Sequence, residues 1–292
     1  METSTAMPWQ LCAHSVPGAM HTRSGMPNQD AVDHWRGAEE RLPILLALAD
    51  GHGSRHSYRS AEGARLAVDA VLDALRDLLA DEEAGAAKAA RDAARRLPPA
   101  LVRRWQDRVQ RDLAAHPLSG QVVEVAEVPE EESVPAGADR SSPYVVYGTT
   151  CLCAAVLPGI LFLGQLGDGD IVTVDAAGRA HRPLPEDARH FANETTSLCS
   201  EDAAAAMRCT TMSLGGRQAP ELVLLATDGY ANSFASDEDF LRVATDLREI
   251  IREEGFPAVS GQLEGWLREA SAEGSGDDIT VGLLYRSPEE TR

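Results

Sequence analysis

The chain is poor in basic residues for its length. Of its 292 residues, 27 are Lys or Arg and 46 are Asp or Glu, so its formal net charge is −19. Proteins that neutralise a nucleic-acid backbone or an anionic membrane surface present clusters of Lys and Arg. The acidic balance therefore argues against both partners, and we expect neither nucleic acid nor a membrane. Most of the excess negative charge is expected to form a solvated surface.

Cysteines and long apolar runs are also scarce. The five cysteines show none of the spacings of a disulfide framework or a zinc site. We expect reduced thiols in the core, including Cys151 and Cys153, whose spacing of two places them on one face of a strand. No stretch approaches the roughly 20 apolar residues of a membrane span. Residues 1–8 lack the basic and apolar parts of a signal peptide, so the expected location is the cytoplasm.

Hydrophobic patterning predicts an α+β protein. Helical periodicity marks residues 60–79, 86–96, 99–113, 240–251 and 259–270. The pair Pro98-Pro99 is expected to end one helix and to begin the next. Strand-like runs occupy residues 9–16, 44–49, 144–147, 150–156, 160–166, 171–174, 208–214, 221–226 and 279–285. Because these runs follow one another like hairpins, the sheets are expected to be antiparallel.

One segment interrupts this pattern. Residues 117–143 combine several glutamates with scattered Pro, Gly and Ser. Such a composition over such a length is typical of a disordered loop. We expect a single domain over residues 9–287 that carries this acidic insertion, with flexible tails at residues 1–8 and 288–292.

Four aspartates stand beside glycine at the ends of predicted strands. They occur in Asp50-Gly51-His52-Gly53, Gly167-Asp168-Gly169, Thr227-Asp228-Gly229 and Gly276-Asp277-Asp278. A single Asp-Gly pair is usually only a turn. If the four strand ends converge, however, their oxygens would form a site for hard divalent cations such as Mg²⁺ or Mn²⁺. Glycine beside each aspartate would let a ligand approach the backbone.

These motifs, in this order, resemble the metal-dependent protein phosphatases of type 2C, most closely a bacterial branch of that family. The resemblance also rests on Asn28-Gln29-Asp30, Gly148-Thr149-Thr150 and residues 192–196, and it extends from about Cys12 to Tyr285. It implies a four-layer α-β-β-α sandwich with two central antiparallel sheets. It also implies hydrolysis of phosphoserine and phosphothreonine by a metal-bridged hydroxide. The implied partners are phosphorylated proteins, namely a Ser/Thr kinase and its substrates.

The resemblance assigns metal ligands residue by residue. Asp50 would bridge two Mn²⁺ or Mg²⁺ ions, and the Gly51 carbonyl would bind one of them. Asp228 and Asp277 would hold the other ion. Asp168, together with Asp228, matches a third and weaker metal position.

Three further residues acquire roles by the same match. His52 corresponds to a histidine proposed as general acid toward the leaving Ser or Thr oxygen, and the alternative is that it orients metal-bound water. Asp278 stands where the family often has Asn, so we expect it to support the ligands from behind rather than to bind an ion. Asp30 is expected to do the same.

Some positions depart from the family pattern. Five residues before the aspartate of the first motif, the family usually has an arginine that grips the substrate phosphate, and here that position is Gly25. Arg23 or His21 could take over this phosphate contact, and each could equally be an ordinary loop residue. Gln29 replaces a glutamate and removes a charge beside the site. Asp170 stands where many relatives have an arginine nearby, which affects the third metal position or a substrate contact.

The missing arginine leaves two other functions open. The chain could be a non-catalytic metal-binding module that recognises phosphoproteins or a regulatory partner. It could also be a phosphoesterase that uses the same site on a small molecule. Because the set of core carboxylates is complete, the protein phosphatase remains the main prediction.

Overall fold

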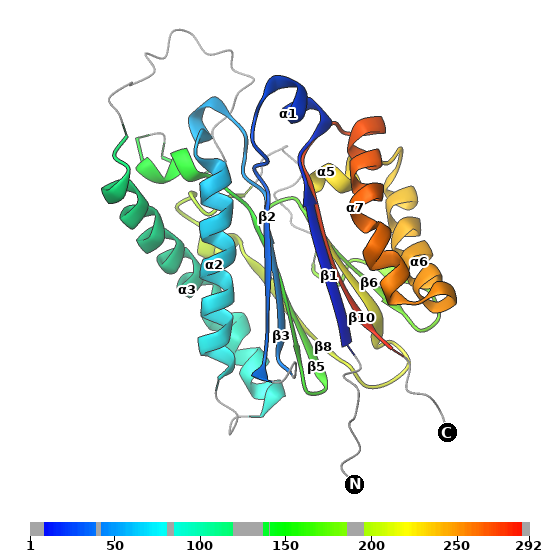
Figure 1. Ribbon diagram of the computed structural model, residues 1–292. Helices are drawn as coiled ribbons and strands as arrows, with labels where there is room; N and C mark the ends of the chain where they lie inside the picture. The colour runs from blue at the N-terminus through cyan, green and yellow to red at the C-terminus, as the bar shows by residue number, and fades with distance from the viewer. Residues whose placement is uncertain are drawn as a thin grey trace.

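Two antiparallel sheets pack face to face, and helices cover their outer faces (Figure 1). The computed structural model describes residues 9–38, 42–80, 85–118, 137–139, 141–185 and 196–287. In these residues the layers run helix, sheet, sheet, helix. The predicted α+β class and the α-β-β-α sandwich are both confirmed.

Each sheet contains five strands. The first has the order β1 (Trp9–Val16), β10 (Ile279–Arg286), β9 (Pro220–Ala226), β6 (Asp170–Asp175) and β7 (Ala180–His181). The second has the order β2 (Ala31–Arg36), β3 (Ile44–Ala49), β4 (Cys151–Leu157), β5 (Ile160–Leu166) and β8 (Arg208–Ser213). Neighbouring strands are antiparallel throughout. The central strands β3, β4 and β9 are buried along their whole length, because both of their faces are covered.

Two pairs of long helices form the outer layers. The second sheet is covered by α2 (Ser60–Leu79) and α3 (Ala86–Ala115), and the first by α6 (Asp237–Glu254) and α7 (Phe256–Glu273). The short elements are α1 (Ala19–Ser24), η2 (Arg55–Ser57), η4 (Pro143–Tyr147), α4 (Ala203–Ala206) and α5 (Asp228–Ala231). In Figure 1, α1 lies at the end of the sandwich that the next subsection describes.

Apolar side chains fill the three spaces between the four layers. The sheet-to-sheet core includes Leu46, Leu152 and Val223, all fully buried. The core under α2 and α3 contains Cys151 and Cys153, which confirms their prediction as buried free thiols. Burial of this apolar surface is the main favourable term for folding, at about 25 cal/mol per Å².

Two element predictions were wrong. The chain does not leave the helix at Pro98-Pro99, because α3 runs through both prolines. Leu97 and Leu101, on either side of the pair, are fully buried, and this packing outweighs the loss of two amide donors. Residues 144–147 form η4 rather than a strand, since the Ser142 hydroxyl accepts from the Tyr144 amide and caps a tight helical turn. In addition, β2 and α1 were not anticipated.

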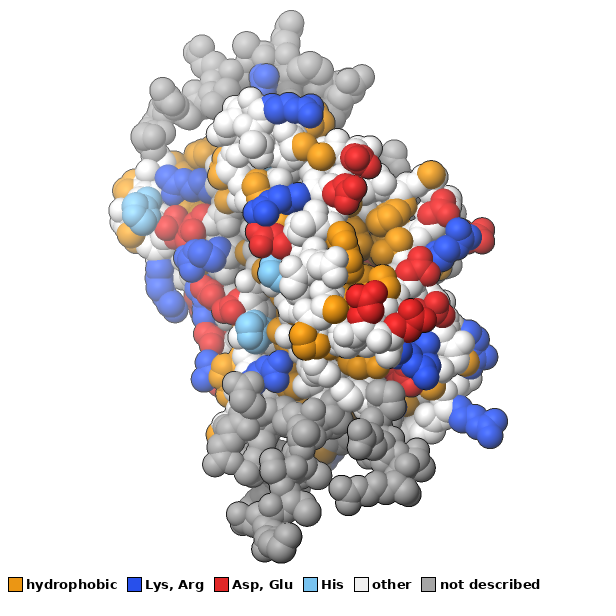
Figure 2. All heavy atoms as spheres, turned by 45° about the vertical axis from the view of Figure 1, so that its right-hand side comes forward, with side chains coloured by type: hydrophobic (Ala, Val, Ile, Leu, Met, Phe, Trp, Pro, Cys, Tyr) orange, Lys and Arg blue, Asp and Glu red, His pale blue; other side chains and the backbone are white. Residues whose placement is uncertain are grey.

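The predicted acidic insertion at residues 117–143 lies largely outside the described residues, and both predicted tails, residues 1–8 and 288–292, lie wholly outside them. The disorder of the insertion and the boundaries of the single domain therefore stay predictions. On the face shown in Figure 2, acidic and basic side chains are interspersed. None of the described helices is both long enough and apolar enough to span a bilayer.

Candidate functional site

A cavity of about 320 Å³ opens at the end of the sandwich where α1 lies. It is lined by His21, Gln29, Asp50, Gly51, His52, Gly53, Thr150, Asp168, Asp228, Asp277 and Asp278. The structure therefore brings together every predicted metal ligand, together with His52, His21 and Asp278. Asp30 and Arg23 are not among the lining residues.

The aspartates reach the cavity from both sheets. Asp50 follows β3 and Asp168 follows β5, both in the second sheet. Asp228 follows β9 and Asp277 precedes β10, both in the first sheet. Because the two sheets pack face to face, the ends of these strands meet and present carboxylates from opposite sides.

Backbone contacts hold the first of these loops in place. The Thr150 hydroxyl accepts from the Asp50 amide at 3.0 Å, and the Thr150 amide donates to the Asp50 carbonyl at 2.8 Å. The Gly51 amide donates to the Gln29 carbonyl at 3.2 Å. A Cβ at Gly51 would lie 2.7 Å from the Ser60 carbonyl, so only glycine fits between the loop and the start of α2.

Negative charge is concentrated in the cavity. Burial raises the pKa of Asp50 well above its usual range, and repulsion from Asp30 and Asp228 adds to the effect. Burial, with repulsion from Asp168, raises the pKa of Asp228 to about 6. The carboxyl groups of Asp50 and Asp228 lie close enough for each to affect the pKa of the other.

The donor set of the cavity fits divalent cations. Among the described residues that line the cavity, neither Lys nor Arg is found. Oxygen-rich, acidic surroundings are what Mg²⁺ and Mn²⁺ prefer. The His52 Nε2 atom is also buried there without a hydrogen-bond partner in the described structure. Bound ions and their water would satisfy both the charge and this nitrogen.

Asp278 is a buried junction beneath the cavity. Its two oxygens accept from the Gly18 amide at 2.6 Å and from the Gln29 amide at 2.7 Å. The contacts tie the segment before α1 to the segment before β2. They agree with the expected supporting role, although Asp278 also reaches the cavity wall.

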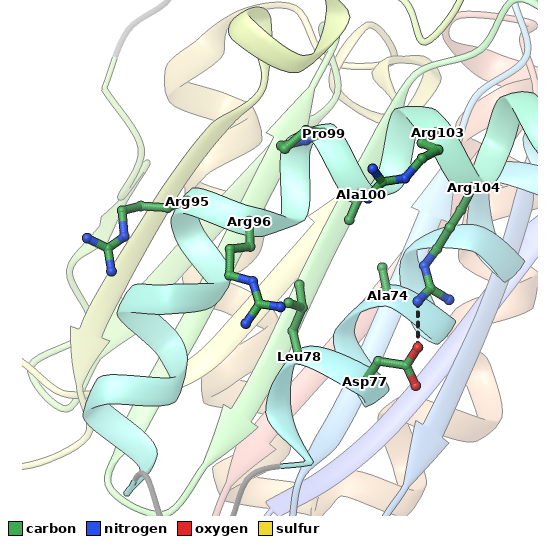
Figure 3. A pocket seen from close by; sticks show the side chains of 9 residues that line it. All are labelled: Ala74, Asp77, Leu78, Arg95, Arg96, Pro99, Ala100, Arg103 and Arg104. Atoms are coloured by element: carbon green, nitrogen blue, oxygen red, sulfur yellow. Dashed lines mark hydrogen bonds and ion pairs between the residues drawn. The ribbon is translucent and has the colours of Figure 1, made fainter.

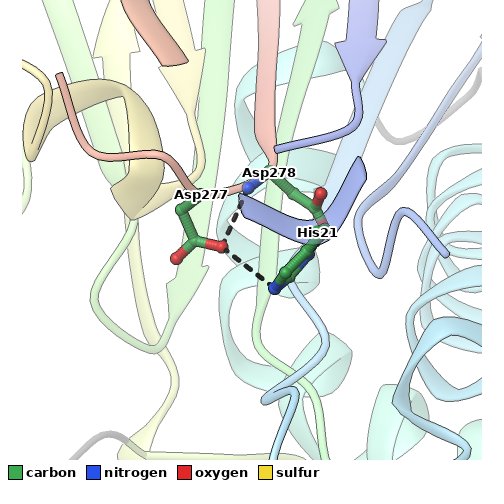
Figure 4. Close-up of side chains that lie close together, drawn as sticks. All are labelled: His21, Asp277 and Asp278. Carbon is green, nitrogen blue, oxygen red and sulfur yellow. Dashed lines mark hydrogen bonds and ion pairs between the residues drawn. The ribbon is translucent and has the colours of Figure 1, made fainter. Parts of the chain in front are cut away.

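His21 points from α1 toward two aspartates, as Figure 4 shows. Its Nδ1 lies 2.9 Å from an Asp278 oxygen, without the alignment of a hydrogen bond, and its Nε2 lies 3.9 Å from an Asp277 oxygen. One ligand atom from each of the three side chains fits within 4.8 Å of the others, a spacing that could hold a metal ion. Of the two candidates for the phosphate contact, His21 lines the cavity, while Arg23 is exposed and is not among the lining residues.

His52 is held tightly against a glycine. Its amide donates to the Gly148 carbonyl at 3.2 Å, and a Cβ at Gly148 would lie 2.8 Å from the imidazole Cδ2. Burial lowers the pKa of His52 to about 4, partly offset by Asp168. Without metal ions the imidazole is therefore neutral near pH 7, with a single N–H to donate.

Asp30 lies behind the cavity rather than in its wall. One oxygen accepts from the Thr227 hydroxyl at 2.8 Å, and that hydroxyl accepts from the Thr280 amide at 2.9 Å. Burial raises the pKa of Asp30 to about 8, and repulsion from Asp278 and Asp228 contributes. This position agrees with the supporting role expected for it.

Thr150 and Gln29 line the cavity, although neither was given a role from the sequence. Thr150 fixes Asp50 through the backbone contacts described above, and it belonged to a motif that carried the resemblance without an assigned function. Gln29 is buried and was noted only as a lost charge. Its side chain lies close to Gly53, where a Cβ would lie 2.5 Å from the Gln29 Oε1. This contact forms only on folding, so no sequence motif indicates it.

Asp170 is used outside the cavity. It accepts from the Arg182 Nε at 2.5 Å, and the same guanidinium binds Asp237 at the start of α6 through two hydrogen bonds of 2.6 and 3.0 Å. The arginine thus joins β6 to α6. Its partners show why an aspartate stands at this position.

Comparison with known proteins gives one family and several similar structures. The family model described as protein phosphatase 2C matches residues 17–268. No curated protein sequence matches the chain. The serine/threonine phosphatase PstP/Ppp of Mycobacterium tuberculosis is 18% identical, with a TM-score of 0.58 and coverage of 96% of this chain and 99% of that one.

Two other solved structures extend the comparison. Stp1 from Staphylococcus aureus is 16% identical, with a TM-score of 0.59 and coverage of 99% of this chain and 98% of that one. The catalytic domain of PstP in complex with two manganese ions is 19% identical, with a TM-score of 0.56 and coverage of 96% and 99%. At these identities the likeness concerns the fold.

Proposed function

The chain belongs to the protein phosphatase 2C family, and we propose that the carboxylate cavity is its active site. As a member of this family it is a metal-dependent protein serine/threonine phosphatase that uses Mn²⁺ or Mg²⁺ ions. One observation carries the site assignment: aspartates from four strand ends converge in a cavity, and its described lining residues include no Lys or Arg.

The residues that would hold two ions are Asp50, the Gly51 carbonyl, Asp228 and Asp277, and Asp168 would contribute to a third position. When bound, the ions supply Lewis acidity toward the phosphoryl oxygens and a water of lowered pKa. The chain itself positions these ligands through Thr150, Asp278 and Asp30, whose contacts are described above.

His52 is proposed to act at the leaving oxygen of the phosphorylated side chain. The packing against Gly148 fixes the imidazole, and its Nε2 has no protein partner that would compete for a substrate contact. Donation of a proton to a serine or threonine oxygen lowers the barrier because an alkoxide is a poor leaving group.

His21 is proposed to contact the substrate phosphate in place of the family arginine. It is the residue of α1 that lines the cavity, and Asp278 and Asp277 flank its ring. An imidazole offers fewer donors than the fork of an arginine. The contact is therefore expected to be weaker, and Arg23 is not proposed for this role because it lies outside the cavity.

The surroundings of the cavity favour a protein substrate over a small phosphoester. The large apolar side chains that are exposed in the described residues are Met20, Met26, Tyr58 and Leu118. Met20 lies in α1, Met26 follows that helix, and Tyr58 follows the loop of His52. Met20 is 62% exposed and Tyr58 is 54% exposed. Apolar side chains beside a charged cavity suit a polypeptide that continues beyond its phosphate.

We further propose that the phosphorylated substrates are products of a Ser/Thr kinase and that the pair acts in bacterial signal transduction. A phosphoester hydrolase of this class needs a kinase that forms the ester. The cytoplasm is the proposed location, because all five cysteines are free thiols, most of them buried.

The decisive experiment measures phosphate release from a phosphothreonine peptide with Mn²⁺, with Mg²⁺ and with EDTA. Release is expected with either metal and should stop with EDTA or in the Asp228→Ala variant. The same enzyme is then given p-nitrophenyl phosphate. Met20→Ala and Tyr58→Ala are expected to raise KM for the peptide several-fold and to leave hydrolysis of the small ester unchanged.

Other outcomes would favour the other two functions. Metal binding by calorimetry without release from any phosphopeptide would indicate the non-catalytic module. Preference for a small phosphoester, with no effect of the Met20 and Tyr58 variants on either substrate, would indicate a small-molecule phosphoesterase.

A further inference from the structure

Helix α3 is strongly basic in an otherwise acidic chain. It carries seven arginines and one lysine against three aspartates, although the whole chain has 46 acidic and 27 basic residues. Its buried face packs on the second sheet through Leu97, Leu101 and Trp105. The arginines are not needed for that packing, which is made by the apolar face.

Four of these arginines surround a hollow of about 500 Å³ between α3 and α2, shown in Figure 3. Arg95, Arg96, Arg103 and Arg104 line it. The helix changes direction around Pro99, as the figure shows, because Pro98 and Pro99 lack the amides that would complete the helical hydrogen bonds. The bend separates the two halves of α3 and places arginines from both around the same space.

The floor of the hollow is apolar. Ala74 and Leu78 of α2, with Pro99 and Ala100 of α3, lie between the arginines. The hollow and the carboxylate cavity have no lining residue in common. It is thus a separate feature of the outer helical layer.

The four guanidinium groups differ in how they are paired. Arg104 binds Asp77 at 2.5 Å across the hollow, and Arg95 binds Asp92 on its own helix at 2.5 Å. Arg96 and Arg103 have neither an ion pair nor a hydrogen bond from their side chains within the described residues, and both are exposed. Figure 3 shows the Arg96 side chain extending toward Leu78 and the Arg103 guanidinium beside Ala100.

We propose that this hollow docks an acidic polypeptide segment of a partner protein. Two unpaired guanidinium groups provide forked donors for carboxylates, and the apolar floor provides a seat for an adjacent aliphatic side chain. A free inorganic anion would bind the guanidinium groups but would make no contact with the apolar residues of the hollow. The local positive charge also attracts an acidic partner that the rest of this acidic chain repels.

Docking here is independent of the proposed phosphatase chemistry, so it can be measured without turnover. The probe is a short fluorescein-labelled peptide rich in glutamate with one leucine, and its anisotropy is followed as the full-length protein is added. The Arg96→Gln/Arg103→Gln variant is expected to raise Kd about tenfold. Affinity should also fall as salt is increased.

A matched control removes the same charge elsewhere on the helix. Arg91 and Arg111 are exposed on α3 and do not line the hollow. Arg91→Gln/Arg111→Gln is expected to change Kd by less than about twofold. Hydrolysis of p-nitrophenyl phosphate should be equal in wild type and both variants, which shows that each is folded.

Three results would overturn the proposal. Absence of peptide binding by the wild-type protein would show that the hollow is not a docking site. If both double variants raised the peptide's Kd equally, the peptide would be attracted only by the net charge of the protein. Competition by inorganic phosphate as effective as competition by unlabelled peptide would show a simple ion site.

Discussion

Two groups of aspartates lie at the same end of the sandwich and differ in how their charge is balanced. In the cavity, Asp50 and Asp228 repel each other, and no Lys or Arg is among the described residues that line it. Outside the cavity, Asp170 is paired with Arg182, which also binds Asp237. Asp168 and Asp170 are only two residues apart and belong to different groups.

The difference separates a ligand site from a structural ion cluster. Buried carboxylates that repel one another oppose folding, and external cations remove that penalty when they bind. Asp170 needs no external ligand, because Arg182 supplies the opposite charge and connects β6 to α6. Substitutions in the first group should therefore affect catalysis, and substitutions in the second should affect stability.

The sharpest contrast is expected between Asp228→Asn and Asp170→Asn. Asp228→Asn should lower kcat at least about a thousandfold, since it removes a proposed metal ligand. Asp170→Asn should keep kcat within about threefold and lower the melting temperature instead. Steady-state kinetics and thermal unfolding of both variants check this, and a large kcat loss in both would erase the distinction.

His52→Ala should be the next largest effect. It is expected to lower kcat about a hundredfold for a phosphothreonine peptide, whose leaving oxygen needs a proton. The loss should be much smaller for p-nitrophenyl phosphate, whose leaving group departs as an anion. Equal losses on both substrates would contradict the acid role and favour orientation of the attacking water.

Divalent ions should stabilise the fold through the cavity. At about one hundred times its Kd, Mn²⁺ is expected to add about 2.7 kcal/mol to the free energy of unfolding. EDTA should remove this gain. Asp228→Asn provides the control, because its melting temperature should hardly respond to Mn²⁺; an unchanged response would place the ions elsewhere.

Arg182→Leu tests the aspartates outside the cavity, whose charge Arg182 balances. It leaves buried Asp170 without its partner and should lower the free energy of unfolding by about 2 kcal/mol. Arg242→Leu is the matched control, since Arg242 forms only exposed pairs with Glu238 and Asp239 on its own helix. That change should amount to less than about 0.5 kcal/mol. Urea unfolding of the two variants measures both values.

The smallest effect concerns pH and the metal-free protein. Burial raises the folded-state pKa of Asp30 to about 8 and that of Asp228 to about 6, above their unfolded values. Protonation therefore favours the folded state, and stability is lost as pH rises through these values. In EDTA the melting temperature should be at least about 4 °C lower at pH 8 than at pH 6. A higher melting temperature at pH 8 would refute the assignment.

Much of the fold could be predicted because short-range sequence patterns indicate most of its helices and strands. The runs before Asp50, Asp168 and Asp228 are strands, as their apolar composition indicated. The path of α3 was less predictable, because proline propensity favours a break and the packing of Leu97 and Leu101 overrides it. Residues 144–147 were misassigned for a similar reason, since a strand-like composition is also compatible with a capped helical turn.

Local motifs identify which carboxylates stand at strand ends, because each Asp-Gly pair and the buried run beside it are neighbours in the sequence. How each side chain is used depends on the packing of distant segments. The orientation of α1 turns His21 into the cavity and leaves Arg23 outside. The position of Arg182 beside Asp170 removes that aspartate from the site. Both outcomes depend on contacts between segments distant along the chain, whose energies no local pattern contains.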